Sequence, residues 1–154
     1  DLVLMCVLDT ESVRHCGFGP GGLATSRETA GKLGIDLSAI AVSGLERIET
    51  GAGNDRIIGT AANEILSGGP GQDVFVFRGQ FGHDTIEDFQ LLLGPRRNGD
   101  VIDVSDLGFQ SFFDILANTQ QVGQNSVIRD TDTDSSITLL NVAKSLLQPD
   151  DFAV

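Results

Sequence analysis

The chain has 154 residues, a formal net charge of −12 and a sequence pI of about 4.2. A surface this acidic repels nucleic acid and anionic membranes and attracts cations. Nucleic acid and membranes are therefore not expected partners. The 19 glycines and the absence of Trp and Tyr are typical of turn-rich β structure rather than of a helical bundle. The longest apolar run near the start, residues 2–8, is too short to span a membrane and lacks the basic flank of a signal peptide.

Residues 1–34 are predicted to form an N-terminal unit of unknown role, a short buried strand followed by a glycine loop. The loop, Gly17–Gly22, satisfies the pattern G-x-G-x-x-G. A dinucleotide site would require a helix that starts inside this loop and a parallel sheet after it. Pro20 and the missing alternation of strands and helices favour a simple glycine loop instead. The two cysteines, Cys6 and Cys16, could pair in an exported protein, but their spacing alone leaves this open.

From residue 35 onward the chain repeats every nine residues. Residues 35–40 predict a short strand, and four blocks of nine cover 41–76 without a gap. Each block has an acid at its sixth position and a large apolar residue at its eighth. The acids are Glu46, Asp55, Glu64 and Asp73, and the apolar residues are Ile48, Ile57, Leu66 and Phe75. No helix or ordinary strand has this period, so the blocks predict turns that alternate with short strands.

The chemistry of one block, residues 68–76, indicates a cation site. Glycines at its first, second and fourth positions allow a sharp turn that aims carbonyls inward beside the acid. Two blocks complete a coil, so Asp55 and Asp73 are expected to lie one above the other. Carboxylate and carbonyl oxygens suit Ca²⁺ better than Zn²⁺ or copper. The apolar interior of such a coil is thin, so the metal-free chain is expected to be largely disordered.

After residue 76 the nine-residue repeat ends, and strands, a helix and a hairpin are predicted. Three strands are expected at 74–77, 84–89 and 101–105, a helix at 111–119, and a hairpin of 126–129 with 136–142. The buried face of the helix is assigned to Phe112, Phe113, Ile115 and Leu116. The hairpin turn contains Asp130, Asp132 and Asp134, which alternate as in the start of an EF-hand loop. Neither the required glycine nor the bidentate Glu follows, so a charged turn is the better interpretation.

Residues 68–76 match G-G-x-G-x-D-x-U-x, and residues 50–76, in which Thr50 replaces the usual first glycine, resemble the RTX (hemolysin-type calcium-binding) repeat. Residues 84–89 and 100–105 resemble the cap that closes the roll in secreted proteases, lipases and alginate epimerases of this kind. The resemblance implies an all-β fold. A short parallel β-roll would cover residues 35–83, and a small β-rich cap with a secretion-signal region would cover 84–154.

The resemblance also implies a set of calcium ligands. These are the carbonyls of Gly51 and Gly53 with Asp55 in the lower turn, and the carbonyls of Gly68 and Pro70 with Asp73 in the upper turn. The opposite edge departs from the pattern because Glu64 stands where Asp is usual and Ala62 replaces glycine, so a vacant or weak site is expected there. Asp73 with Asp84 or Asp88 is expected to hold another ion at the capped end. For Asp84 and Asp88, surface charge or turn capping is the alternative.

The implied function is calcium binding by the non-catalytic C-terminal part of a larger bacterial protein. Such a protein is exported by a type I secretion machine, which reads an uncleaved C-terminal signal that residues 150–154 resemble. We expect an extracellular monomer, and a fragment or processed product because the first residue is Asp1. The chain has neither H-E-x-x-H nor G-x-S-x-G. The alternatives are a calcium-dependent adhesin tip, or a substrate- or carbohydrate-binding module of an exported enzyme such as an alginate epimerase. The lack of Trp and Tyr disfavours the sugar-binding module.

Overall fold

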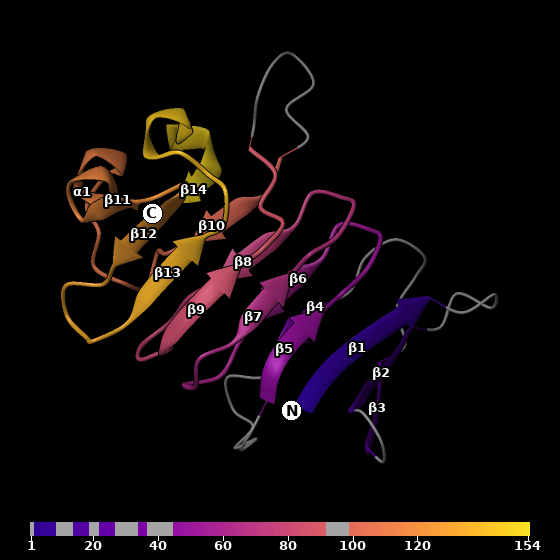
Figure 1. Cartoon of the computed structure of the whole chain (residues 1–154). Helices are drawn as coiled ribbons and strands as arrows, with labels where there is room; N and C mark the ends of the chain where they lie inside the picture. The colour runs from indigo at the N-terminus through magenta and orange to yellow at the C-terminus, as the bar shows by residue number, and fades with distance from the viewer. Residues whose placement is uncertain (1, 9–13, 19–21, 27–33, 37–44, 92–98) are drawn as a thin grey trace.

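The computed structural model describes the backbone of residues 2–8, 14–18, 22–26, 34–36, 45–91 and 99–154, and side chains from Arg47 onward. Within these residues the protein is an all-β structure of two sheets with a few short helices (Figure 1). The described strands form a nine-stranded sheet, in the order β11-β12-β13-β9-β7-β5-β1-β2-β3, and a five-stranded sheet, in the order β14-β10-β8-β6-β4. The predicted fold class is confirmed.

The bounds of the elements follow chain order. The strands are β1 (Leu2–Leu8), β2 (Arg14–Phe18), β3 (Gly22–Ser26), β4 (Gly34–Asp36), β5 (Leu45–Glu49), β6 (Arg56–Ile58), β7 (Ile65–Ser67), β8 (Val74–Val76), β9 (His83–Ile86), β10 (Val101–Asp103), β11 (Thr119–Val122), β12 (Asn125–Arg129), β13 (Ser136–Leu139) and β14 (Phe152–Ala153). The helices are α1 (Phe112–Ala117) and the 3-10 turns η1 (Lys144–Leu146) and η2 (Pro149–Asp151).

The repetitive part winds back and forth between the two sheets. β5, β7 and β9 pair in parallel in the large sheet, and β4, β6, β8 and β10 pair in parallel in the small one. β6, β7 and β8 are three residues long, and each is followed by a turn that carries the chain to the other sheet. This arrangement is the parallel β-roll that the nine-residue period predicted. Turns of alternate blocks therefore stack on two edges. We call the edge with turns 50–55 and 68–73 the first edge, and the edge with turns 59–64 and 77–83 the second edge.

The apolar residues of the eighth positions and four later residues form two ladders inside the structure. In the small sheet the ladder runs Ile57, Phe75, Ile102 and Phe152, and in the large sheet it runs Ile48, Leu66, Ile86 and Leu139. All eight side chains are buried. Each such side chain contributes about 1.5–3 kcal/mol when removed from water. The two ladders belong to one buried cluster that continues from the roll into the cap.

The N-terminal strands extend the large sheet beyond the roll. β1, which was predicted as a strand, pairs in parallel with β5, and β2 and β3 continue antiparallel from it. The glycine motif 17–22 joins the end of β2 to the start of β3, and its residues 19–21 lie outside the described residues. A strand rather than a helix begins at Gly22. This argues against a dinucleotide loop, as the sequence indicated.

The C-terminal cap contains the predicted helix and hairpin. α1 begins after Ser111, whose hydroxyl accepts from the Asp114 N–H at 3.3 Å. Its burial differs from the prediction at one position, because Phe113 is 80% exposed whereas Ile115 is fully buried. Residues two apart on a helix point about 200° apart, so the two side chains cannot share one face. β12 and β13 form the hairpin, and the turn between them is stabilised by Asp130, which accepts from the Thr133 hydroxyl at 2.5 Å.

Two cap strands were not predicted. β11 adds to β12 at the edge of the large sheet, and β14 pairs in parallel with β10 in the small sheet. Phe152 of β14 is buried and lies against Phe112, with ring centroids 5.8 Å apart. The C-terminal residues are therefore part of the folded cap.

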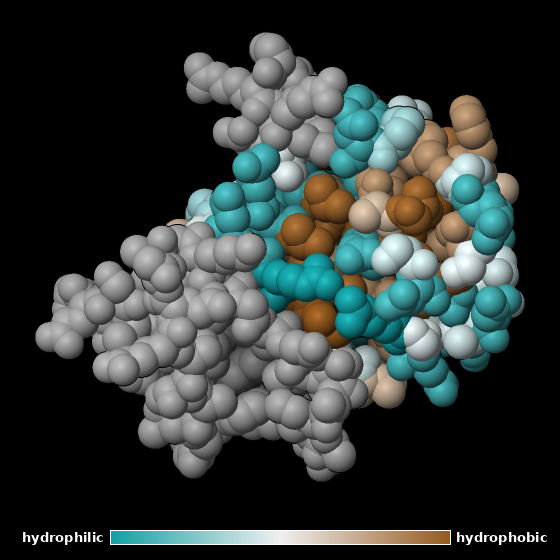
Figure 2. All heavy atoms as spheres, turned by 180° about the vertical axis from the view of Figure 1, so that it is seen from behind, coloured by the Kyte–Doolittle hydropathy of each residue, from teal (hydrophilic) through white to brown (hydrophobic). Residues whose placement is uncertain are grey.

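The surface carries few large apolar residues. Those exposed among the described residues are Ile65, Phe113, Val122, Leu146 and Val154. Figure 2 shows apolar residues as separate patches among hydrophilic ones over the described part of the face seen there. No helix within the described ranges is long and apolar enough to cross a membrane.

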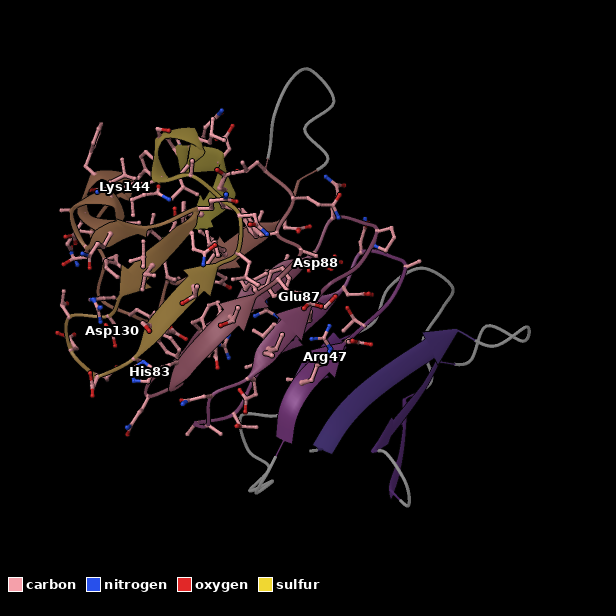
Figure 3. The ribbon with its side chains drawn as sticks, viewed as in Figure 1. Arg47, His83, Glu87, Asp88, Asp130 and Lys144 are labelled. Atoms are coloured by element: carbon pink, nitrogen blue, oxygen red, sulfur yellow. The ribbon has the colours of Figure 1, made fainter. Side chains whose placement is uncertain are left out.

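One ion pair ties the roll to the start of the cap. Arg47 of β5 lies close to Glu87, which follows β9, and donates from Nη1 to Glu87 Oε2 at 3.0 Å (Figure 3). Hydrogen bonds to Glu87 and then to Glu49 raise the pKa of Arg47. The side chains of Arg47 and Glu87 are 26% and 30% exposed, so the pair contributes about 1 kcal/mol or less.

Candidate metal centre

The turns of the first edge stack so closely that glycine is required at several positions. Gly51 and Gly53 have φ values of 84° and 136°, which residues with a side chain rarely adopt. Gly71 has no such φ, but a Cβ added to it would lie 1.6 Å from the carbonyl oxygen of Gly53. The glycines of the repeat thus allow one turn to rest directly on the backbone of the turn below.

The predicted carbonyl ligands belong to these two stacked turns. The Gly53 N–H donates to the Pro70 carbonyl oxygen at 2.9 Å, and the Thr50 hydroxyl donates to the Gly68 carbonyl oxygen at 3.0 Å. Each of these carbonyls keeps a second lone pair for a cation. The Gly51 carbonyl faces the next turn, since a Cβ on Gly69 would lie 2.4 Å from its oxygen.

The aspartates of the first edge form a ladder of hydrogen bonds. The Asp55 N–H donates to Asp73 Oδ1 at 2.8 Å, and the Asp73 N–H donates to Asp100 Oδ1 at 3.0 Å. Asp55 and Asp73 therefore lie one above the other, and each is only 1% exposed. The other carboxylate oxygen of Asp73, Oδ2, is buried and has no hydrogen-bond partner. Burying a carboxylate oxygen in this way is costly unless a cation balances it.

The second edge repeats this geometry with Glu64 and Asp84. The Glu64 N–H donates to Asp84 Oδ1 at 2.8 Å, and the Thr85 N–H donates to the Glu64 carbonyl oxygen at 2.8 Å. Asp84 Oδ2 is buried without a hydrogen-bond partner, as Asp73 Oδ2 is. Asp84 thus occupies on the second edge the place that Asp73 has on the first. The expectation that Asp84 joins Asp73 at the capped end is wrong, because the two aspartates stand on opposite edges of the roll.

Glu64 adapts to its position by folding back on its own turn. Its carboxylate accepts from the Thr60 N–H at 3.1 Å and from the Thr60 hydroxyl. A cavity of about 80 Å³ lies beside this turn, with Gly59 and Asp84 among its lining residues. The longer side chain therefore uses acceptor positions of its carboxylate within its own turn.

At the capped end, Asp88 and Asp100 are supplied with protein donors. Asp88 accepts from the N–H groups of Gly68 at 3.2 Å and Gly69 at 2.8 Å, and from the Ser67 hydroxyl at 2.7 Å. Asp100 Oδ2 accepts from the Gln90 N–H at 2.8 Å. Figure 3 shows Asp88 and His83 at opposite ends of β9, so Asp88 belongs to the first edge. Asp88 closes the last turn of this edge, which is the turn-capping role named as its alternative.

Burial and mutual repulsion make these carboxyls hard to ionise without a cation. Burial, followed by the charges of Asp100 and Asp55, raises the pKa of Asp73 to about 7. Burial, followed by the charge of Glu64, raises the pKa of Asp84 to about 8. Burial raises the pKa of Asp100 to about 6 and also raises that of Glu64. Asp73, Asp84 and Asp100 form no ion pair with a described Lys or Arg, so their charge is uncompensated.

The donor set fits a hard divalent cation. Within the part of the chain that the structure describes, no three His, Cys, Asp or Glu side chains come together as a metal cage. An ion on either edge would therefore be bound by backbone carbonyls together with one or two carboxylates. All of these are oxygen ligands, and their number and spacing along stacked turns suit Ca²⁺. Asp73 and Asp84 would contribute the oxygens that have no protein partner.

Comparison with known sequences agrees with this geometry. The family model of the RTX calcium-binding nonapeptide repeat (4 copies) matches residues 40–75.

Residues 40–75 are RTX calcium-binding nonapeptide repeats.

Comparison with solved structures adds a structural likeness. The extracellular lipase LipA from Serratia marcescens aligns over 99% of this chain and 26% of its own, with 20% sequence identity and a TM-score of 0.46. The chain therefore spans about a quarter of the length of that lipase. No curated protein matches the chain.

The structure adds repeat-like segments beyond the RTX match. Asp84 and Ile86 have the acid-to-apolar spacing of positions six and eight, with Gly82 at position four, but they come two residues later than the strict period predicts. Asp100 and Ile102 have the same spacing and continue the ladder of the first edge. Asp100 was not among the predicted ligands. Allowing insertions between RTX blocks would have placed Asp84 beside Glu64 and would have found Asp100.

Lowering the pH is expected to weaken calcium binding to these repeats. The pKa values of about 7 for Asp73 and about 8 for Asp84 lie above their ordinary value of 3.8, so protons compete with the cation throughout this window. Without calcium the sign is reversed. The folded state then binds more protons than the unfolded state between the ordinary and raised pKa values, so the contribution of these groups to stability is lost as the pH rises.

Calcium titrations at pH about 8.5 and about 5.5 measure this effect directly. We expect clearly weaker binding at the lower pH, together with a more stable metal-free fold. An affinity that stays constant across this range would show that neither aspartate takes part in binding.

Proposed function

We propose that this chain is a calcium-driven folding module, in which ions between the stacked turns complete the β-roll. The observation that carries the proposal is Asp73 at the centre of the first edge. Its Oδ1 accepts a hydrogen bond from the Asp55 N–H at 2.8 Å. Its Oδ2 is buried without a hydrogen-bond partner, beside the turns whose carbonyls are the proposed ligands. A calcium ion at this oxygen would balance a charge that the protein itself leaves uncompensated.

The dependence of folding on calcium follows from the balance between the apolar core and the high net charge. Each short strand of the roll contributes one side chain to a ladder, and these ladders offer little to offset the entropy of ordering many short turns. The net charge of −12 adds repulsion in the compact state. Calcium binds the folded turns and not the extended chain, so binding free energy becomes folding free energy. At the millimolar calcium typical for extracellular modules the roll would fold, and at lower calcium it would open.

Small-angle scattering of the full chain tests this proposal. In excess calcium we expect a radius of gyration of about 15 Å, the value for a compact monomer of this length. In chelator it should rise toward about 41 Å, the value for an unfolded chain. Magnesium serves as the control and should not restore the compact form. Equal radii in calcium and in chelator would refute the folding switch, and a doubled scattering mass would refute the monomer.

We further propose that the chain is a non-catalytic part of a larger bacterial protein exported by type I secretion and active outside the cell. A chain that stays unfolded at low calcium is suited to passage through a narrow channel, and one that folds at high calcium becomes compact after release. The RTX repeats at residues 40–75 support this role. Expression of the chain with and without a type I exporter tests it. Appearance in the medium without the exporter would contradict this route and would leave the calcium proposal untouched.

A further inference from the structure

The N-terminal strands place the two cysteines of the chain opposite one another. β1 and β2 run antiparallel in an unbroken register from Leu4 opposite Phe18 to Leu8 opposite Arg14. Within this register Cys6 is the direct partner of Cys16. These are the two cysteines of the whole sequence, so the ladder brings together the one pair that could form an internal cross-link.

The backbone geometry of such a pair suits a disulfide. Residues directly opposite in an antiparallel ladder have Cα atoms about 4.5 or 5.5 Å apart, depending on whether the pair is hydrogen-bonded. Disulfides join Cα atoms that are about 4.4–6.8 Å apart, so either kind of pair falls within reach. We propose that Cys6 and Cys16 form a disulfide across β1 and β2 when the protein meets an oxidising environment.

The oxidation needs a disulfide as its electron acceptor, for which oxidised glutathione is the probe. The thiolate of one cysteine attacks a sulfur of the probe, which forms a mixed disulfide and releases one glutathione thiolate. The thiolate of the second cysteine then attacks the protein sulfur of that mixed disulfide and releases the second glutathione. Overall, the two cysteine S–H bonds and the S–S bond of oxidised glutathione break. The protein S–S bond and two glutathione S–H bonds form, so two protons and two electrons pass from the cysteines to glutathione.

The cross-link would fix the N-terminal hairpin beside the roll. β1 carries Cys6 and also pairs in parallel with β5, where Leu4 lies opposite Ile48 of the large-sheet ladder. A disulfide at Cys6 therefore restrains the strand that covers the first repeat. It closes only a short loop of chain, and no metal takes part in the exchange reaction itself.

Thiol–disulfide equilibrium with glutathione tests the proposal on the full chain. Trypsin cleaves after Arg14 and so separates Cys6 from Cys16. A linked pair of peptides that separates on reduction therefore identifies the internal disulfide by mass spectrometry. We expect the equilibrium constant for the linked form to be about tenfold or more larger in calcium-loaded native protein than in urea, because a cross-link that fits the fold is favoured by it.

A matched control moves one cysteine by a single residue. In Cys16→Ser/Gly17→Cys the loop length changes by one residue, so oxidation in urea should be nearly unchanged. The new cysteine lies opposite Met5 rather than Cys6, so the two cysteines no longer occupy directly opposite positions of the ladder. The native enhancement should therefore disappear in this variant. Wild-type protein whose equilibrium constant in the native state is no larger than in urea, or which yields mainly mixed disulfides or linked dimers, would overturn the proposal.

Discussion

Gly71→Ala is expected to abolish calcium-dependent folding of the roll. The added Cβ would lie 1.6 Å from the carbonyl oxygen of Gly53, so the two stacked turns must separate. Backbone on both sides leaves no flexible side chain to give way, and both turns supply carbonyls to the proposed site. We expect a calcium affinity lower by at least about a hundredfold, since separating the turns removes several ligands at once. Calcium titration followed by circular dichroism measures it.

Gly79→Ala provides the control for this substitution. Gly79 has a φ of 54°, so alanine there is strained, but no neighbouring atom lies within 4 Å of the added Cβ. The expected cost is about 1–2 kcal/mol of stability with an unchanged calcium affinity. If both variants lose calcium binding to the same extent, loss of general stability rather than separation of the stacked turns would explain the result.

Asp73→Asn is expected to have opposite effects on the two states of the protein. The amide keeps an oxygen to accept the Asp55 N–H and removes a carboxylate whose burial raises its pKa to about 7. Above that pH the metal-free fold should therefore become more stable. Calcium loses a charged ligand, and the affinity should fall by at least about tenfold, since even indirect partners of metal ligands contribute this much. Chemical denaturation with and without calcium measures both effects.

Asp106→Asn is the charge-matched control. Asp106 pairs with Arg78 at 3.0 Å, and both side chains are largely exposed. Its loss removes the same formal charge from the surface, away from the ladder of aspartates, and should change the calcium affinity little. A similar loss of affinity in both variants would mean that net charge rather than the Asp73 oxygen governs binding.

The roll itself could be predicted from the sequence because its period is set by turn geometry. Ile57 and Phe75 occupy the same position in their blocks and lie opposite one another in the structure. Asp55 and Asp73 likewise follow from their spacing. In each case a local pattern of glycine, acid and apolar residue specifies the turn and the strand, and stacking then follows from repetition.

Acids beyond the strict repeat were harder to place, because insertions shift the register without changing the fold. Asp84 comes two residues late, and this shift hides the fact that it stands over Glu64 rather than over Asp73. Asp100 comes still later in the sequence, and its carboxylate accepts the Asp73 N–H in the same ladder. The spacing from each acid to its apolar partner is conserved within the chain even where the spacing between blocks is not.

The cap depended on tertiary contacts that no local pattern shows. β14 is only two residues long and is defined by its pairing with β10, while Phe152 is buried against Phe112. The exposure of Phe113 arises because α1 is a short helix whose core-facing side is already filled by Ile115. Apolar character alone therefore overstated the buried face of this helix.

The most direct test of the calcium-driven fold is a far-UV circular dichroism titration of the metal-free full chain with calcium, with magnesium as the control. We predict a largely disordered spectrum in chelator and a cooperative rise of β signal with calcium only. A chain that already shows its full β signal in chelator and does not respond to calcium would contradict it. In that case the buried oxygens of Asp73 and Asp84 would have to be neutralised by protons rather than by a metal ion.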